Sequence, residues 1–271
     1  MLKKRAEQRR HPVHFWRRAT PLTGPTLFIL RNFLSSLNNC VNSGDTVFLY
    51  ELHQHTKSCS KCASVTPAEM VLSVRECGFS GVVLTNHFYH GNSGIDRDRS
   101  WRDFCKAYED EFYEAKNAGE KIGVDVIYGL EEHVGNGKEV LLYGIAPDFI
   151  AEYPELKEYN FPLLSEIVRS AGGLVIQAHP FRDRSWITDV DNPLDPTFVD
   201  GYELYNKNNR PGEDSRAQTV FADCGLIKTA GTDNHAYISS GRNGIAVSHR
   251  IKNEKELAKV LKSGDYELHI E

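Results

Sequence analysis

The sequence contains no apolar run long enough to cross a bilayer, no internal repeat and no low-complexity tract. The apolar stretch at residues 26–34 (TLFILRNFL) is too short and is interrupted by Arg31. Hydrophobic residues make up 40% and aromatic residues 10% of the 271 residues, which is typical of a globular protein. We therefore expect one large domain with its own core and no membrane partner.

Cysteine is too sparse and too scattered for a disulfide scaffold, because six cysteines are spread over the whole chain. A single C-x-x-C pair occurs, Cys59 and Cys62, without a second pair at zinc-ribbon spacing. It stands in a Ser/Lys segment ahead of a helix start at Thr66, whereas a redox motif opens a helix. We expect free loop thiols and a cytoplasmic location.

Excess positive charge is confined to the N-terminal segment. Residues 1–45 carry eight Lys/Arg against two acidic residues, which is a net charge of +6. Since the net charge of the whole chain is −5, residues 46–271 carry −11. An acidic body argues against a nucleic-acid groove, and nucleic acid is not expected as a stable partner. We expect residues 1–45 to be a basic, poorly ordered or peripheral extension and residues 46–271 to form the folded domain. The sequence does not indicate an oligomeric state.

From Thr46 onward, short β-rich runs alternate with longer amphipathic runs. Strands are expected within residues 46–53, 79–87, 124–133, 139–145, 173–180, 199–206, 225–235 and 266–270. Helices are expected within residues 67–77, 101–122, 161–171, 215–224 and 253–263. Such alternation implies parallel βαβ units, and about seven of them predict an α/β fold with a closed or nearly closed barrel.

Histidines and carboxylates gather where the predicted strands end. These residues are His53, His55, His87, Glu131, His179, Glu203, Asp233 and His235. In a parallel barrel the carboxyl ends of all strands open on one face, so the side chains are expected to converge. A single histidine at a strand end is more often structural than metal-binding, and it is the recurrence over five strand ends that favours a metal site.

Two pairs strengthen this interpretation. His53 and His55, like Asp233 and His235, are two residues apart, and such residues point to the same side of an extended chain. Imidazole and carboxylate ligands without thiolate suit Zn, Mn or Fe. The general order of affinities of divalent metals does not show which of the three is bound. His90 and His133 stand near the same strand ends and are candidates for additional ligands.

Five short motifs in this order resemble the PHP (polymerase and histidinol phosphatase) family of metal-dependent phosphoesterases. The motifs are ELHQHT, LTNH, GLEEH, QAHP and GTDNH, between residues 50 and 242. The resemblance is strongest to small stand-alone members. It implies a distorted (β/α)7 TIM-like barrel over residues 46–271 with two, or at most three, divalent metal ions at the carboxyl face.

The resemblance also implies a ligand set. His53, His55, Glu131 and Asp233 would hold the first metal, Glu131 would bridge to a second one with His87, and His179 and His235 would complete the set. Many members carry a further ligand where this chain has Ser60 or Lys61, and a histidine in the strand that here reads EVLLYG. We therefore expect two metals more than three. Asn86 replaces the usual Asp of a TDH motif and is expected to support the site.

The activity implied is hydrolysis of a small phosphomonoester or a nucleotide-type substrate by a metal-activated hydroxide. Asp233, His179 and His235 are the predicted catalytic residues, with either histidine protonating the leaving alkoxide. Arg182, in HPFR, is a candidate phosphate clamp, and Arg242 and Lys207 are weaker candidates for substrate binding.

Two other functions are compatible with parts of the pattern. A metal-dependent amidohydrolase shares the H-x-H pair and a late Asp, but a metal-bridging Lys would be expected at a middle strand end, where this chain has His and Glu. A metal-binding or structural PHP module without activity is the non-enzymatic alternative, which the two departures from the family pattern would permit.

Overall fold

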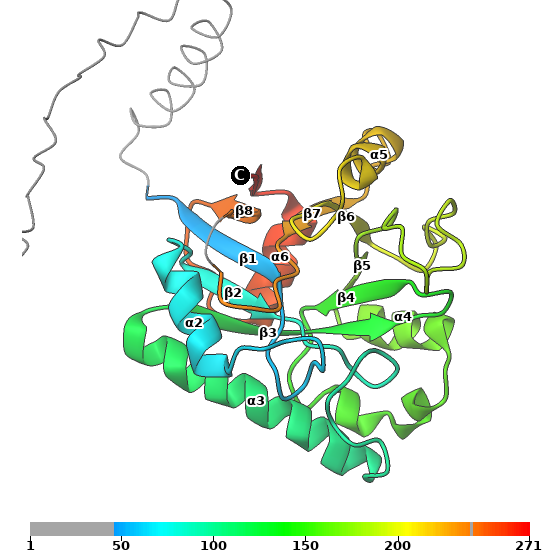
Figure 1. Ribbon diagram of the computed structural model, residues 1–271, viewed down its shortest axis with the longest axis horizontal. Helices are drawn as coiled ribbons and strands as arrows, with labels where there is room; N and C mark the ends of the chain where they lie inside the picture. Colours follow the sequence, from blue (N-terminus) through cyan, green and yellow to red (C-terminus); the bar gives the residue numbers. More distant parts are fainter. Residues whose placement is uncertain (1–45, 239–240) are drawn as a thin grey trace, which may run out of the picture. The chain divides into compact units, whose positions relative to one another are not determined.

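The computed structural model describes residues 46–238 and 241–271 (Figure 1). The predicted N-terminal extension, residues 1–45, lies outside the described residues. The strands of the described part are β1 Phe48–Gln54, β2 Gly81–Leu84, β3 Asp125–His133, β4 Glu139–Tyr143, β5 Leu174–Gln177, β6 Gly201–Asn206, β7 Ile227–Gly231, β8 Gly244–Val247 and β9 Glu267–His269. No described helix is long and apolar enough to span a membrane.

The helices lie where the sequence predicts them, except that the helix expected within residues 215–224 spans Glu213–Val220. They are α2 Pro67–Glu76, α3 Trp101–Ile122, α4 Phe161–Ser170, α5 Glu213–Val220 and α6 Glu254–Ser263, with two short 3₁₀ turns at Ile150–Glu152 and Pro154–Lys157. Thr66 and Glu69 form a reciprocal capping box at the start of α2. The long α3 is capped by Ser100 and ends at Gly123, which has a φ of 78°.

The strands form one sheet in the order β7-β6-β5-β4-β3-β2-β1-β8-β9. The sheet curves into a nearly closed barrel. At one end, the N–H of Asp233 donates to the carbonyl of His53 (2.9 Å) and the N–H of His55 donates to the carbonyl of Asn234 (3.1 Å), which joins the end of β7 to the end of β1. The predicted barrel class is confirmed.

The prediction that the barrel strands are parallel is wrong at β4 and β8. β1, β2 and β3 pair in parallel, as do β5, β6 and β7, but β4 is antiparallel to both neighbours and β8 is antiparallel to β1 and β9. The turn between β3 and β4 is a five-residue segment, residues 134–138, which is too short for a parallel crossover. β4 therefore begins, rather than ends, at the face where β3 ends.

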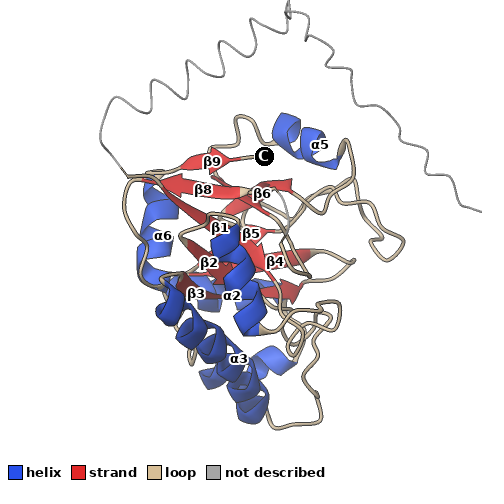
Figure 2. Ribbon diagram, turned by 60° about the vertical axis from the view of Figure 1, so that its left-hand side comes forward, coloured by secondary structure: helices blue, strands red, loops and turns tan. Residues whose placement is uncertain are grey.

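Two buried apolar clusters hold the helices to the sheet. α2 and α3 pack on each other and along β2 and β3, as Figure 2 shows. The second cluster joins Tyr50, Ile127 and Tyr143 of the strands to Leu257 and Leu261 of α6. The sequence analysis missed β8, because the four residues of GIAV are few and show no alternation, although Asn243 and Gly244 at its start form a turn signal.

Candidate metal centre

Four of the predicted ligands form one buried group at the ends of β1, β3 and β7. Nε2 of His53 lies 3.2 Å from Oε1 of Glu131 and 3.4 Å from Oδ1 of Asp233. Nε2 of His55 lies 3.4 Å from Oε2 of Glu131 and 3.2 Å from the same Asp233 oxygen. All four side chains are at most 2% exposed. Three segments that are far apart in the chain thus bring their atoms to a single point, and one of them supplies both histidines.

These separations fit a bound cation. Ligand atoms held by one tetrahedral zinc at about 2.0–2.2 Å lie about 3.3–3.6 Å from one another. Nε2 of His53, Nε2 of His55 and Oε2 of Glu131 are buried and have no hydrogen-bond partner within the described chain. Buried polar atoms are rarely left unpaired in native proteins, so these orphaned atoms fit a metal ion as their missing partner.

A second group shares Glu131 and contains a residue that the sequence analysis missed, Glu139. Nδ1 of His87 lies 3.0 Å from Oε2 of Glu131 and 3.4 Å from Oε1 of Glu139. Nε2 of His179 lies 3.2 Å from Oε1 of Glu131 and 3.4 Å from Oε2 of Glu139. Burial, and then the charge of Glu131, raise the pKa of Glu139 to about 7.

Glu139 is the first residue of β4, directly before Val140 in the segment that lacks the family histidine. The sequence analysis looked for ligands at the carboxyl ends of strands, and Glu139 stands at an amino end. Only the antiparallel direction of β4 brings this end to the site. A five-residue gap after the glutamate motif, too short for a crossover helix, is the signal that could have identified it.

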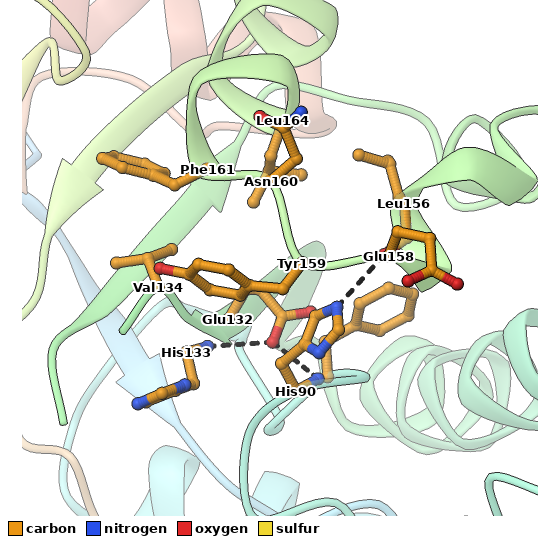
Figure 3. Close-up of a pocket in the computed structure, with 11 residues that line it drawn as sticks. His90, Glu132, His133, Val134, Leu156, Glu158, Tyr159, Asn160, Phe161 and Leu164 are labelled. Carbon is orange, nitrogen blue, oxygen red and sulfur yellow. Dashed lines mark hydrogen bonds between the residues drawn. The ribbon is translucent and has the colours of Figure 1, made fainter. Parts of the chain in front are cut away.

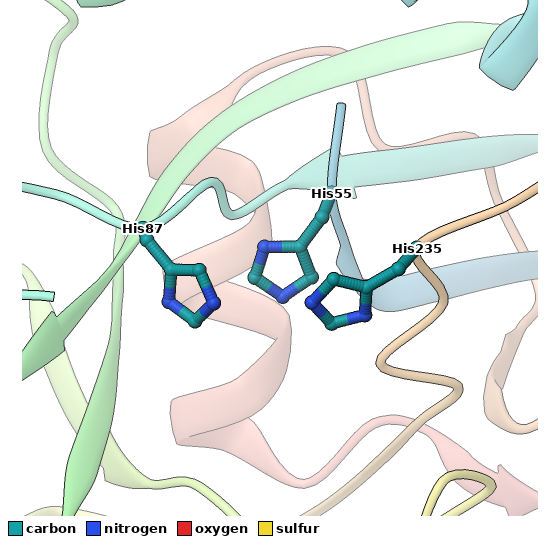
Figure 4. Close-up of side chains that lie close together, drawn as sticks. All are labelled: His55, His87 and His235. Carbon is teal, nitrogen blue, oxygen red and sulfur yellow. The ribbon is translucent and has the colours of Figure 1, made fainter. Parts of the chain in front are cut away.

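The third group consists of three imidazoles, those of His55, His87 and His235, which lie close together in Figure 4. The ring centroids are 4.6 Å apart for His55 and His87 and 4.2 Å apart for His55 and His235. The structure therefore brings together all seven predicted metal ligands. Their role as ligands stays a prediction.

Ser60 and Asn86 orient His55. The Ser60 hydroxyl donates to Oδ1 of Asn86 (2.9 Å), so its oxygen is left to accept from Nδ1 of His55 (3.1 Å) and from the N–H of His87 (3.0 Å). Asn86 also binds the N–H and hydroxyl of Thr56. With its proton on Nδ1, His55 presents a bare Nε2 to the first group, which is the supporting arrangement common around metal-binding histidines.

Glu203 has the same function for His53. Nδ1 of His53 lies 3.1 Å from Oε1 of Glu203, whose other oxygen accepts from the Asn206 amide (2.8 Å) and from the N–H of His179 (3.0 Å). Nδ1 of His235 is 2.8 Å from the carbonyl of Asp233, its nearest acceptor. Glu203, found by its strand position, thus lies behind the ligand groups rather than within them.

The charges in the cluster keep Glu131 and Asp233 ionised. Burial by itself would raise the pKa of Glu131, but His53 and His87 hold it well below its usual value. Burial would also raise the pKa of Asp233, but the positive charges of His53 and Arg182 hold it well below its usual value. Burial lowers the pKa of His53, but Asp233 and Glu131 raise it well above its usual value. A divalent cation entering the site would displace such protons.

Two of the predicted ligands have an unusual backbone conformation. His179 has a φ of 30° and Asp233 a φ of 51°, in the left-handed region that non-glycine residues seldom adopt. Such strain persists where the surrounding structure over-determines it, and it concentrates at functional sites. At both positions the turn directs the side chain toward Glu131 or the H-x-H pair.

The three predicted substrate-binding residues have different surroundings. Nη1 of Arg182 lies 2.7 Å from Oδ2 of Asp233, and its other nitrogens donate to Asn206 (2.8 Å) and Asn209 (2.9 Å). Lys207 lines a neighbouring cavity of about 330 Å³ rather than the cavity over the ligands. Arg242 pairs with Glu271 and lines neither cavity. Their substrate contacts stay predictions.

The predicted ligands open into a cavity of about 510 Å³. It is lined by Cys62, His87, Asn92, Glu131, Glu139, His179, Arg182, Arg184, Trp186, Ile187, Asn208, Asp233 and His235. This volume lies within the range of small-molecule sites, about 300–1,000 Å³. The cavity and the ligand groups together can hold a small molecule against bound cations.

Cys62 differs from the loop thiol that the sequence analysis predicted. It lines the cavity, whereas Cys59 is buried beside it in the chain. Burial would raise the pKa of the Cys62 thiol, but hydrogen bonding with His235 and His87 outweighs burial and lowers the pKa to about 6. The five cysteines of the described part are free thiols, as predicted.

His90 and His133 lie around Glu132, outside all three groups. One oxygen of Glu132 accepts from the N–H of His90 (2.8 Å) and of His133 (2.9 Å), and the three residues line a separate small cavity (Figure 3). Glu131 and Glu132 are neighbours in a strand and therefore point to opposite sides. Burial, the largest influence, raises the pKa of Glu132 to about 8.

No protein-family model matches the chain, and no curated protein matches it. Solved structures do resemble it. One is a two-domain protein containing a predicted PHP-like metal-dependent phosphoesterase from Bacteroides vulgatus, with 15% identity, 84% of this chain and 66% of that chain covered, and a TM-score of 0.60.

Two further structures are a lesion-specific endonuclease from Pyrococcus furiosus and an amidohydrolase from Chromobacterium violaceum. The endonuclease is 15% identical to this chain, and the match covers 82% of this chain and 58% of the endonuclease with a TM-score of 0.53. The amidohydrolase is 13% identical to this chain, and the match covers 81% of this chain and 97% of the amidohydrolase with a TM-score of 0.51. This chain thus spans less than two thirds of the Bacteroides protein and of the endonuclease. The fold of this chain is that of the PHP-like metal-dependent phosphoesterases.

Proposed function

We propose that this chain is a PHP-type metal-dependent phosphoesterase that hydrolyses a small phosphomonoester or a nucleotide-type substrate in the cytoplasm. The observation that carries the proposal is the pair of ligand groups that share Glu131. His53, His55 and Asp233 complete one group, and His87 and Glu139 complete the other. A carboxylate that belongs to two groups is the bridging ligand that a two-metal hydrolase requires.

The residues present would hold two divalent ions such as Zn, Mn or Fe. When bound, such ions acidify water into a nucleophile at neutral pH and offset charge on phosphoryl oxygens. Ser60 and Glu203 hold the two histidines of the H-x-H pair in the tautomer with a bare Nε2. Arg182 fixes the outer oxygen of Asp233 and carries positive charge on the cavity wall, where a phosphate would approach.

His235 is the better candidate for the leaving-group acid. Its side chain is 22% exposed and lines the cavity, whereas the side chain of His179 is 3% exposed and points Nε2 between two carboxylates. When His235 is protonated on both nitrogens, Nδ1–H can donate to the Asp233 carbonyl while Nε2 releases its proton to an alkoxide. The neutral imidazole that remains keeps its proton on Nδ1. His179 is then left to the second ligand group.

The amidohydrolase alternative is less well supported by the side chains. Such an enzyme would be expected to have a bridging lysine, and within the described residues no lysine lines the cavity. Lys138, the buried lysine next to Glu139, instead donates to Asp189 (3.2 Å) and to the carbonyl of Asn192. Glu131, which belongs to both groups, would hold both ions in place of such a lysine.

The test is hydrolysis of a broad phosphoester panel by the full chain loaded with Mn or Zn. We expect His53→Ala to abolish turnover with an unchanged circular dichroism spectrum, and His249→Ala, which removes an exposed histidine, to leave turnover unchanged. Stoichiometric metal binding without hydrolysis of any ester would reject the proposal. If the parent is also inactive and His53→Ala unfolds, the structural metal-binding module is the correct alternative.

A further inference from the structure

Trp186 is a large aromatic side chain with no apparent structural function. It is 66% exposed, the most exposed of the large hydrophobic residues in the described part. Within residues 46–238 and 241–271, its indole has no aromatic neighbour, no cation over its ring and no hydrogen-bond partner. A single exposed apolar residue is ordinary on a protein surface, so it is the place of Trp186 at a cavity that gives its exposure meaning.

Trp186 lies on the wall of the cavity that contains the predicted metal ligands. The same 510 Å³ space is lined by Glu131, Glu139 and His179 and also by Trp186 and Ile187. The carboxylates and histidines attract a cation and its phosphate. The indole and Ile187 instead offer an apolar surface, which suits the organic part of an ester and not its phosphate.

The backbone of Trp186 is held by the β3–β4 turn. The Thr188 N–H donates to the carbonyl of Asn136 (3.1 Å). Gly137 approaches so closely that a Cβ atom there would lie 2.5 Å from the carbonyl oxygen of Trp186. This turn leads directly into Glu139, so the segment that supplies a member of the second group also holds the backbone of Trp186.

The neighbouring charge is already paired. Nη1 of Arg184 donates to Glu213 (2.7 Å) and Nη2 donates to the carbonyl of Asn208 (3.2 Å), and the side chain is 14% exposed. Arg184 therefore fixes the start of the loop rather than reaching for a ligand. Arg184 thus has its hydrogen-bond partners within the protein, whereas the indole of Trp186 has none among the described residues.

We propose that Trp186 is a specificity-determining residue that stacks on a flat aromatic ring, such as a nucleobase, in the organic part of the substrate. The proposal rests on the proposed phosphoesterase function and narrows its substrate class to ring-bearing phosphoesters. A base stacked on an aromatic side chain gains binding energy through its π-face and needs no sequence-specific hydrogen bond.

The kinetic test compares adenosine 5′-monophosphate with ribose 5-phosphate, which has the same sugar and phosphate but no base. We expect Trp186→Ala to raise KM for adenosine monophosphate about tenfold or more with little change in kcat, and to change KM for ribose 5-phosphate less than about twofold. Trp186→Phe should restore part of the affinity. Tyr113→Ala, which removes an aromatic residue of α3 exposed to a similar degree (43%), should change neither substrate.

A binding measurement keeps this inference separate from the proposed function. We expect adenosine monophosphate, but not ribose 5-phosphate, to quench the tryptophan fluorescence of the full chain, and Trp186→Phe to abolish that quenching. Quenching without hydrolysis of any phosphoester would reject the proposed reaction and retain the stacking site. Equal affinity for both ligands, or quenching that persists in Trp186→Phe, would reject the stacking site whether or not the chain hydrolyses phosphoesters.

Discussion

Nδ1 of His55 lies 3.1 Å from the hydroxyl of Ser60, and this contact determines which nitrogen of His55 faces the ligand groups. Ser60 can accept this hydrogen bond because its own proton goes to Asn86. By comparison with the family pattern, Ser60 stands close to where a metal ligand was expected. In the structure Ser60 instead orients His55, a predicted ligand.

Replacing Ser60 with alanine should weaken metal binding and leave the fold intact. Without the hydroxyl, the His55 ring can rotate and adopt either tautomer, and the loss of such an orienting partner typically lowers metal affinity about 10–100-fold. Isothermal titration with Zn or Mn measures the change. Ser58→Ala, at an exposed position of the same loop, is the matched control. Equal affinity in both variants would contradict the orienting role.

Glu139→Gln should reduce the number of bound metals from two to one per chain. The substitution keeps the size of the side chain but removes the charge that faces His87 and His179, while the first group retains all four members. Metal content after gel filtration, measured by inductively coupled plasma mass spectrometry, checks the result. Glu132→Gln, at a buried carboxyl outside the groups, should retain two metals. Two metals in both variants would remove Glu139 from the ligand set.

Metal addition should stabilise the protein, and more strongly at high pH. At 100 times the dissociation constant a ligand adds about 2.7 kcal/mol, which corresponds to a rise in Tm of about 5–10 °C for a domain of this size. Carboxylates raise the pKa of His53 and His87 well above the usual value, so their protons compete with the metal as the pH falls. Scanning fluorimetry with Mn at pH 8 and at pH 6 should show the larger shift at pH 8. A larger shift at pH 6 would be inconsistent with histidine ligands.

Glu132→Gln should flatten the pH dependence of stability between about pH 4.3 and about pH 8. Burial raises the pKa of Glu132 to about 8 in the folded chain, against about 4.3 when unfolded. Between these values the folded state binds more protons, so this residue lowers the free energy of unfolding by up to about 1.4 kcal/mol per pH unit as the pH rises. Urea titrations from pH 5 to pH 9 should show a fall in the free energy of unfolding that is up to about 1.4 kcal/mol per pH unit shallower in the variant than in the parent, because Glu51 and Glu139 also have raised pKa values and are present in both. An unchanged slope would mean that Glu132 is already ionised in the fold.

Gly137→Ala should weaken the discrimination between adenosine monophosphate and ribose 5-phosphate. The new Cβ would meet the Trp186 backbone and the Cα atom of Ile187 at 2.5 and 2.7 Å, so the loop must shift. Gly172→Ala is the control, because Gly172 has a similar left-handed φ of 86° but nothing within 4 Å. Both variants place an alanine at a left-handed φ, which strains the backbone. Only Gly137→Ala should change the ratio of KM for ribose 5-phosphate to KM for adenosine monophosphate. An equal ratio in both would show that the position of the loop does not matter.

The sequence by itself determined the elements and most of the cluster. Amphipathic periodicity and capping residues such as Thr66 and Ser100 are local properties, and all five helices and eight of the nine strands of the described part were predicted from them. The H-x-H and D-x-H pairs share a side because backbone geometry fixes the direction of alternate side chains. The barrel then follows from the rule that parallel strands end on one face.

Tertiary structure alone decided the direction of β4, and with it the place of Glu139 beside His87. Strand direction depends on which neighbours pair, and no local pattern in EVLLY specifies that pairing. Tertiary contacts also decide the place of Trp186 at the cavity and of Asn86 beside Ser60, whereas strand alternation by itself separates Glu131 from Glu132. Composition and periodicity constrain residues near in the chain, whereas a metal centre is built from contacts between residues far apart in it.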